Sequence, residues 1–137
     1  MRVHNLCKLV LGISLYLLLV VKMGDMEAFR AKYSDKVMSH TVLAANGQCM
    51  IWTGTRKRGR GAEYGVLCCK WGGRWRTFSV HRLSIIFSRL WHLEDISERG
   101  MDVSHLCHNS LCVNPQHLTY EPHQVNRIRS ACVRAGE

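Results

Sequence analysis

The sequence is short of acidic residues and has neither internal repeats nor a low-complexity tract. Its 10 aspartates and glutamates are outnumbered by 19 lysines and arginines, which gives a formal net charge of +9. The absence of repeats excludes a repeat array, and a hydrophobic content of 47% excludes a largely disordered chain. The 137 residues are enough for one small domain, whose limited core would benefit from a bound metal.

The positive charge indicates a polyanionic partner, and nucleic acid is the first choice. A basic surface that only favours solubility is the simpler alternative. Much of the excess comes from eight residues, which are Arg56, Lys57, Arg58 and Arg60, followed by Lys70, Arg74, Arg76 and Arg82.

Seven cysteines cannot all pair within one chain, so a complete set of internal disulfides is excluded. Cys107, Cys112 and His117 follow one another at intervals of five residues. Such thiolate and imidazole ligands are typical of zinc, which takes four in a tetrahedron, and a closed shell makes that zinc structural. Cys49 is the first choice for the fourth ligand because it opens a predicted strand after a polar turn. Three other residues are alternatives: His108, Cys68 and Cys69.

The N-terminus contains an apolar run over residues 9–21 that resembles the apolar region of a signal peptide. As a helix it would span about 20 Å, short of the roughly 30 Å of a hydrocarbon core. No small-x-small cleavage site follows. A secretion signal, an apolar anchor and a leader upstream of a start at Met23 or Met26 remain open. Membrane contact is expected only if this segment is real; an intracellular location is favoured, and secretion is the alternative.

The spacing of apolar residues predicts the elements of the remaining chain. We expect helices over 26–38, 81–92 and 121–134, and strands over 49–53, 63–70, 74–80 and 102–106. The two middle strands form a hairpin around Gly72-Gly73. Residues 55–62 are expected as an exposed loop and 107–117 as a metal loop. Leu83, Ile86, Phe87 and Leu90 share one face of the second helix.

The run from His105 through Cys107, Cys112 and His117, with Asn126 after it, resembles the His-Cys box homing endonucleases of the wider His-Me finger nuclease superfamily. A histidine two residues before the first zinc cysteine and a later asparagine are specific to that pattern. The close match covers 102–132, and a looser one reaches back to residue 49.

The resemblance implies a role for each matching residue. His105 matches the general base, Asn126 matches the asparagine that holds the catalytic magnesium, and Arg74 is the nearest match to an arginine on the scissile phosphate, with Arg76 second. The zinc ligands would be Cys49, Cys107, Cys112 and His117. The family prototypes carry a second structural zinc, which would begin at Cys132; because the chain stops at Glu137, we expect that site to be absent.

We therefore expect an apolar leader of uncertain status over 1–25, followed over 26–137 by a small α+β domain. This domain would be a zinc-stabilised ββα (His-Me finger) unit with an antiparallel hairpin and flanking helices. Its function would be magnesium-dependent hydrolysis of double-stranded DNA, without a small-molecule cofactor and with a homodimer left open. The alternative is a non-catalytic zinc-containing DNA-binding module, which has no need of His105 and Asn126. The expected DNA contacts are Arg56, Lys57, Arg58, Arg60 and Arg76.

Overall fold

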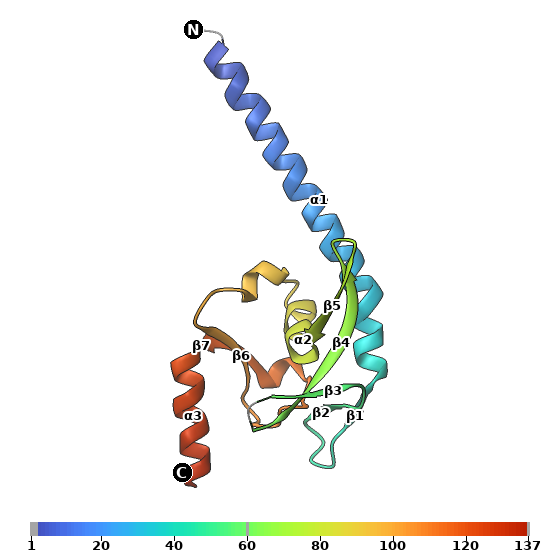
Figure 1. The fold of residues 1–137 in the computed structure, drawn as a ribbon, viewed down its shortest axis with the longest axis vertical. Helices are drawn as coiled ribbons and strands as arrows, with labels where there is room; N and C mark the ends of the chain where they lie inside the picture. Colours follow the sequence, from blue (N-terminus) through green and yellow to red (C-terminus); the bar gives the residue numbers. More distant parts are fainter. Residues whose placement is uncertain (1–2, 60, 137) are drawn as a thin grey trace. The chain divides into compact units, whose positions relative to one another are not determined.

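The computed structural model describes residues 3–59 and 61–136. Contacts within the chain group it into two units, one reaching to Lys32 and one from Tyr33 onward. The fold combines helices with antiparallel sheets, which agrees with the predicted α+β class (Figure 1).

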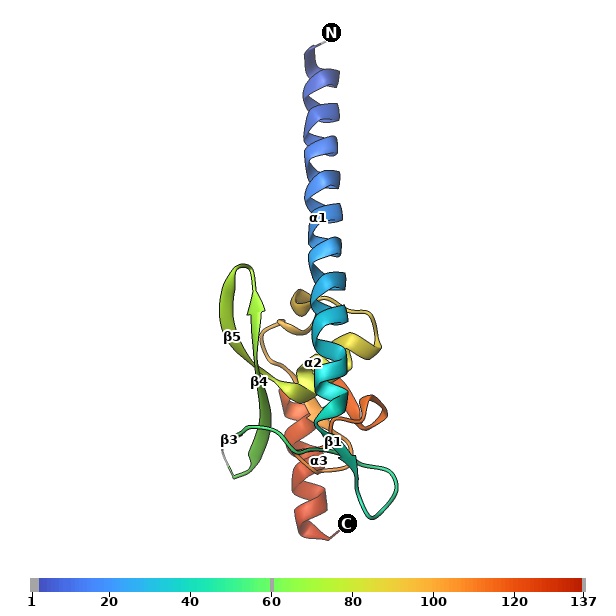
Figure 2. The same ribbon diagram turned by 90° about the vertical axis from the view of Figure 1, so that its right-hand side faces the viewer.

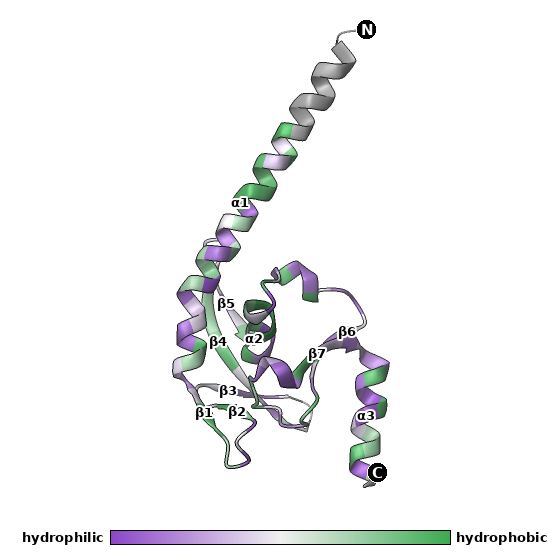
Figure 3. Cartoon of the chain, turned by 180° about the vertical axis from the view of Figure 1, so that it is seen from behind, coloured by the Kyte–Doolittle hydropathy of each residue, from purple (hydrophilic) through white to green (hydrophobic). Residues whose placement is uncertain are grey.

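The first unit consists of most of helix α1 (Val3–Ser39). Hydrophobic side chains between Ile13 and Val21 are exposed, and Figure 3 shows this part of α1 as mainly hydrophobic. Of the helices in the described ranges, none combines the length and hydropathy that a membrane crossing needs. The helix predicted over 26–38 is confirmed as part of α1, and the status of 1–25 stays a prediction.

The second unit contains the predicted hairpin. Strand β4 (Glu63–Trp71) pairs antiparallel with β5 (Arg74–Ser79), and the turn residues Gly72 and Gly73 have φ of 57° and 75°. Two consecutive left-handed residues are what a tight two-residue hairpin turn requires, and glycine adopts them without strain. Gly72-Gly73 therefore fixes the register of this hairpin.

The expected loop over 55–62 is partly wrong, because it contains strand β3 (Arg56–Arg58). β3 pairs with the first residues of β4, whereas β5 pairs with the later ones, as both views show (Figures 1 and 2). All residues of β3 are exposed, so the sequence shows no apolar alternation that would predict a strand here. The strand forms because its backbone pairs with β4.

A tryptophan anchors the start of this unit. Trp52 ends β2 (Met50–Trp52), which pairs with β1 (Thr41–Leu43), and its side chain is 1% exposed. Its ring lies so close to Gly65 that a Cβ there would approach Cδ1 to 2.5 Å. The indole Nε1 donates to the carbonyl of Thr55 at 2.9 Å. Glycine at position 65 is thus required by the close approach of the ring.

Helix α2 (Val80–Ser88) supplies much of the core, with Val80, Leu83 and Ile86 fully buried. The helix is shorter than the predicted 81–92. It ends because Leu90 adopts a left-handed φ of 54° while Trp91 N donates to the carbonyl of Ile86 at 2.9 Å, a Schellman-type ending. Leu90 consequently lies beyond the helix and is exposed, so its predicted place on one helical face with Leu83 and Ile86 is wrong.

The last elements surround the metal loop. After the 3-10 turn η1 (Leu93–Ile96), strand β6 (Met101–His105) confirms the prediction for 102–106. It pairs antiparallel with β7 (Leu118–Pro122), which precedes α3 (His123–Ala135). The sequence prediction started the helix at 121 and missed β7. Pro115 also begins a short 3-10 turn, η2 (Pro115–His117), where irregular structure was expected.

Candidate metal centre and adjoining cavity

Within the described ranges, one group of metal-ligating side chains converges on a point. The ligand atoms of Cys49, Cys107, Cys112 and His117 all lie within 4.8 Å of one another. Cys49 and Cys112 are buried, and the other two are half-buried. The structure therefore brings together the residues that the sequence suggested as zinc ligands.

Backbone pairing brings Cys49 to Cys112. Cys49 immediately precedes β2, and β2 forms an isolated bridge with the metal loop, in which Ile51 lies opposite Cys112. Trp52 N donates to the carbonyl of Leu111 at 2.9 Å, and Val113 N donates to that of Met50 at 2.7 Å. These two hydrogen bonds tie together segments some sixty residues apart in the sequence.

The hairpin of β6 and β7 closes the base of the loop. Its last pair joins His105 to Leu118, and the next residue, Leu106, donates its N–H to the carbonyl of His117 at 2.8 Å. Cys107 and His117 are therefore held at the two ends of one loop. Asn114 accepts from Gln116 N at 3.0 Å and so begins the 3-10 turn that carries His117.

The distances suit a tetrahedral zinc. Nδ1 of His117 lies 3.6 Å from Sγ of Cys49 and 3.6 Å from Sγ of Cys112. Two ligands at typical Zn–S and Zn–N distances of about 2.3 and 2.0 Å would be about 3.5 Å apart at the tetrahedral angle. Burial raises the pKa of the Cys112 thiol to about 12, so a cation is needed to keep it as a thiolate. The donor set and its spacing therefore fit zinc.

The alternative ligands lie elsewhere. His108 and Cys68 are exposed, and Cys69 is buried in β4, but none of the three belongs to the cluster. His108 adopts a left-handed φ of 57° and turns the chain between Cys107 and Asn109. Cys49 is accordingly the fourth side chain of the converging group.

His105 ends β6 directly before the metal loop. Its Nε2 lies 3.0 Å from the carbonyl oxygen of Cys112. A carbonyl only accepts, so Nε2 carries the hydrogen and Nδ1 of the neutral ring is left as an acceptor. Burial, with a smaller contribution from nearby Arg129, lowers the pKa of His105 to about 4 against the raising effect of this hydrogen bond. The ring is therefore neutral at neutral pH.

A cavity of about 380 Å³ is lined by both His105 and Asn126, and the metal loop contributes His108 and Ser110 to its wall. The two residues come from β6 and α3. Tyr64, His108 and Arg134 also line it. The structure thus brings the histidine and the asparagine to one solvent-accessible space beside the Cys and His cluster.

The two arginines suggested for phosphate contact lie outside the described lining of this cavity. Arg74 begins β5 beside the Gly72-Gly73 turn, and Arg76 follows on the same strand. Arg134 on α3 is the arginine found in the described lining. Its place could not be inferred from the sequence, since it depends on how α3 packs.

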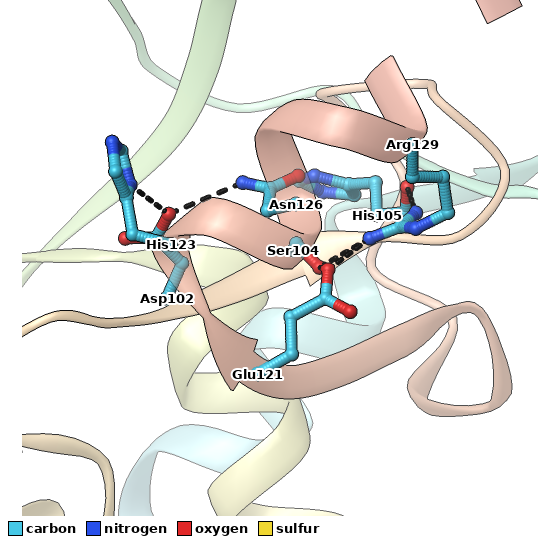
Figure 4. Close-up of polar contacts among 7 residues, drawn as sticks. All are labelled: Asp102, Ser104, His105, Glu121, His123, Asn126 and Arg129. Atoms are coloured by element: carbon cyan, nitrogen blue, oxygen red, sulfur yellow. Dashed lines mark hydrogen bonds and ion pairs between the residues drawn. The ribbon is translucent and has the colours of Figure 1, made fainter. Parts of the chain in front are cut away.

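Polar contacts fix α3 on the β6–β7 hairpin (Figure 4). Arg129 donates to the backbone carbonyl of His105 at 3.0 Å, and it also contacts the Ser104 hydroxyl and pairs with the carboxylate of Glu121. The Arg129 and Glu121 side chains are 24% and 13% exposed. This half-buried ion pair therefore ties β6, β7 and α3 together around His105.

His81 is the residue that sequence reasoning undervalued. It lies near the start of α2, and the centroid of its ring is 4.7 Å from that of His105. Burial, with a smaller contribution from the adjacent His105, lowers the pKa of His81 to about 3. Its Nδ1 is buried without a hydrogen-bond partner among the described residues. No spacing in the sequence links the two histidines, so only the fold reveals the contact.

The basic group suggested for DNA contact forms an exposed edge. Arg56, Lys57 and Arg58 make up β3, and Arg56 pairs with Glu63 across 3.7 Å. Arg60 lies outside the described residues. The turn that follows β3 contributes Gly61 and Ala62 to the cavity lining, so this charge lies next to the cavity.

Comparison with known protein families gives a match. Residues 48–137 match a family model described as the zinc-binding loop region of homing endonuclease. No curated protein and no solved structure matches the chain.

Proposed function

Because the chain belongs to the family of the zinc-binding loop region of homing endonucleases, we propose that it is a magnesium-dependent DNA endonuclease with a structural zinc. The family is one of nucleases, zinc binding fits the Cys and His cluster, and DNA is the substrate that the family implies. In this proposal β6, β7 and α3 form the ββα unit of a His-Me finger, with the metal loop between its strands. A homodimer stays a prediction.

The observation that carries the proposal is the cavity shared by His105 and Asn126. Zinc binding requires neither residue there. The hydrogen bond to Cys112 leaves Nδ1 of His105 free to accept a proton. Asn126 contributes an amide oxygen, a ligand type that magnesium prefers. A base and a hard oxygen ligand in one cavity suit phosphodiester hydrolysis.

The chain's own residues then have distinct roles. Nδ1 of His105 takes a proton from a water molecule, whose oxygen attacks the phosphorus while the bond to the 3′ oxygen breaks. Asn126 would hold magnesium, which when bound supplies positive charge to the leaving oxygen. The zinc ligands keep the loop closed, and a shell closed by protein ligands has no position for a reacting water.

Positive side chains would bind the DNA backbone. Arg56, Lys57 and Arg58 lie on the exposed strand next to the cavity, and Arg134 lines it. Arginine forms strong charge-assisted hydrogen bonds with phosphate, so Arg134 competes with Arg74 for the role of contacting the scissile group.

A non-catalytic DNA-binding module is the second candidate, because the zinc cluster and the positive charge serve it equally well. Incubation of the purified chain with supercoiled plasmid separates the two. The endonuclease converts the plasmid to nicked or linear forms with Mg²⁺ and leaves it intact with EDTA. Retarded but uncut plasmid in both conditions would support the binding module instead.

A further inference from the structure

The carboxylate of Asp102 lies between two donors from the first turns of α3. Nδ1 of His123 is 2.6 Å from Oδ2 of Asp102, and Nδ2 of Asn126 is 3.2 Å from the same oxygen. Residues three apart on a helix lie on one face, so both donors reach the strand together. Asp102 is the second residue of β6, on the strand that ends at His105.

This arrangement determines which way the Asn126 amide faces. An ionised carboxylate only accepts hydrogen bonds, so the amide nitrogen must be turned towards Asp102 and the oxygen away from it. Figure 4 shows the nitrogen of Asn126 on the side of Asp102 and the oxygen on the side of His105. The amide oxygen is thereby directed to the cavity side that His105 also lines.

The ionised state of Asp102 is supported by its surroundings. Nδ1 of His123 and Nδ2 of Asn126 both approach the same oxygen, an arrangement that suits a carboxylate accepting two hydrogen bonds. At neutral pH the carboxyl group is therefore an acceptor only.

We propose that Asp102 is a positioning residue, which holds the Asn126 amide so that its oxygen faces a divalent cation in the cavity. This inference rests on the proposed function for the identity of that cation site. Asp102 acts through Asn126 and does not itself contact the cation. Residues that orient a metal ligand in this way typically contribute about 10- to 100-fold to metal affinity.

The test is a titration of the zinc-loaded full chain, labelled with ¹⁵N, with Mn²⁺ alone. Paramagnetic broadening of the Asn126 side-chain amide signals reports a nearby cation without requiring DNA cleavage. In the parent, broadening should centre on Asn126. Asp102→Ala should raise the Mn²⁺ concentration at half-broadening about 10- to 100-fold. Asp102→Asn, which retains an oxygen acceptor, should give an intermediate value and decides the matter if the alanine variant does not fold.

The Mg²⁺ requirement of plasmid cleavage distinguishes a positioning role from a merely structural one. Asp102→Ala should raise the Mg²⁺ requirement of plasmid nicking, with the rate approaching that of the parent at saturating Mg²⁺. In the Asn126→Ala background, the same change should add nothing to the Mg²⁺ requirement, because Asp102 acts through Asn126. Ser104→Ala, which alters the same strand without touching Asn126, controls for loosening of the hairpin.

The outcomes separate the two proposals. If the parent shows broadening at Asn126 but does not nick plasmid, the endonuclease proposal is contradicted. The Mn²⁺ titration of the Asp102 variants then decides the role of Asp102. Nicking by the parent with an unchanged half-broadening concentration in both Asp102 variants overturns the role of Asp102. An additional effect of Asp102→Ala in the Asn126→Ala background overturns it as well.

Discussion

His105 and Cys112 are joined by a hydrogen bond of 3.0 Å from the imidazole Nε2 to the backbone carbonyl of the cysteine. The loop that would bind zinc thereby also selects the tautomer of the proposed base. Holding Cys112 by its thiolate fixes the carbonyl on the same residue, and this carbonyl in turn fixes the ring. Zinc is structural in this account, yet its loss should abolish catalysis by releasing His105.

Zinc content provides the first prediction. Chain purified without added metal should contain about one zinc, and Cys112→Ala should lose both the zinc and the fold, because structural zinc contributes on the order of 10 kcal/mol in small metal-folded domains. Elemental analysis and circular dichroism measure the two effects. Cys68→Ala is the matched control, since Cys68 is exposed and lies outside the cluster. A folded Cys112→Ala variant without zinc would contradict the structural role.

The exposed strand β3 should contribute to DNA affinity through charge alone. Replacing Arg56, Lys57 and Arg58 by glutamine should weaken binding similarly for different sequences. Each lost phosphate contact should reduce the slope of log affinity against log salt by roughly one. Fluorescence anisotropy over a range of salt concentrations measures both effects. Lys22→Gln, which removes an exposed positive charge from α1, serves as the control. Equal slopes for the β3 variant and the parent would mean that the strand is only solvated.

The positions of Arg134 and Arg74 lead to opposite predictions about which arginine contacts the scissile phosphate. Because Arg134 lines the cavity with His105, Arg134→Ala should slow nicking more than Arg74→Ala does. A charge-assisted hydrogen bond of about 1.5–3 kcal/mol corresponds to roughly a 10- to 100-fold loss in rate. Single-turnover plasmid nicking measures the rates, with Arg127→Ala on the same helix as control. A larger loss for Arg74→Ala would return the role to the hairpin, as the family resemblance suggested.

The ion pair between Arg129 and Glu121 should contribute to stability. Arg129→Met leaves the half-buried Glu121 carboxylate without its arginine partner, so we expect a loss of about 1–3 kcal/mol in the free energy of unfolding. Replacing both partners, with Arg129→Met and Glu121→Leu, should recover part of that loss because no charge remains unpaired. Urea unfolding of zinc-loaded protein measures both variants. Equal destabilisation of the single and double variants would argue against the ion pair as the cause.

Local patterns explain which parts of the fold could be predicted. The Gly72-Gly73 turn determines the β4–β5 hairpin through its own backbone preference, and apolar spacing identifies α2. The even spacing of Cys107, Cys112 and His117 likewise predicts a metal loop. By contrast, β3 and β7 are stabilised by pairing with other strands, and such pairing leaves little trace in the composition of short polar segments.

The same distinction applies to the site. Cys49 was chosen from its position before a strand, and the β2 bridge to the metal loop brings it to the cluster. The contacts of Asp102 with Asn126 and of His81 with His105 depend on how α3 and α2 pack on β6. Because neither contact has a fixed spacing in the sequence, the residues that position the site became evident only in the structure.

The account's central claim is that His105 acts as the base of a nuclease, and plasmid nicking by His105→Ala tests it most directly. His92→Ala is the matched control, since His92 lies outside the described lining of the cavity. With zinc content and DNA affinity equal to those of the parent, His105→Ala should nick plasmid about 100- to 10,000-fold more slowly in Mg²⁺, whereas His92→Ala should match the parent. Undiminished nicking by His105→Ala would contradict the claim.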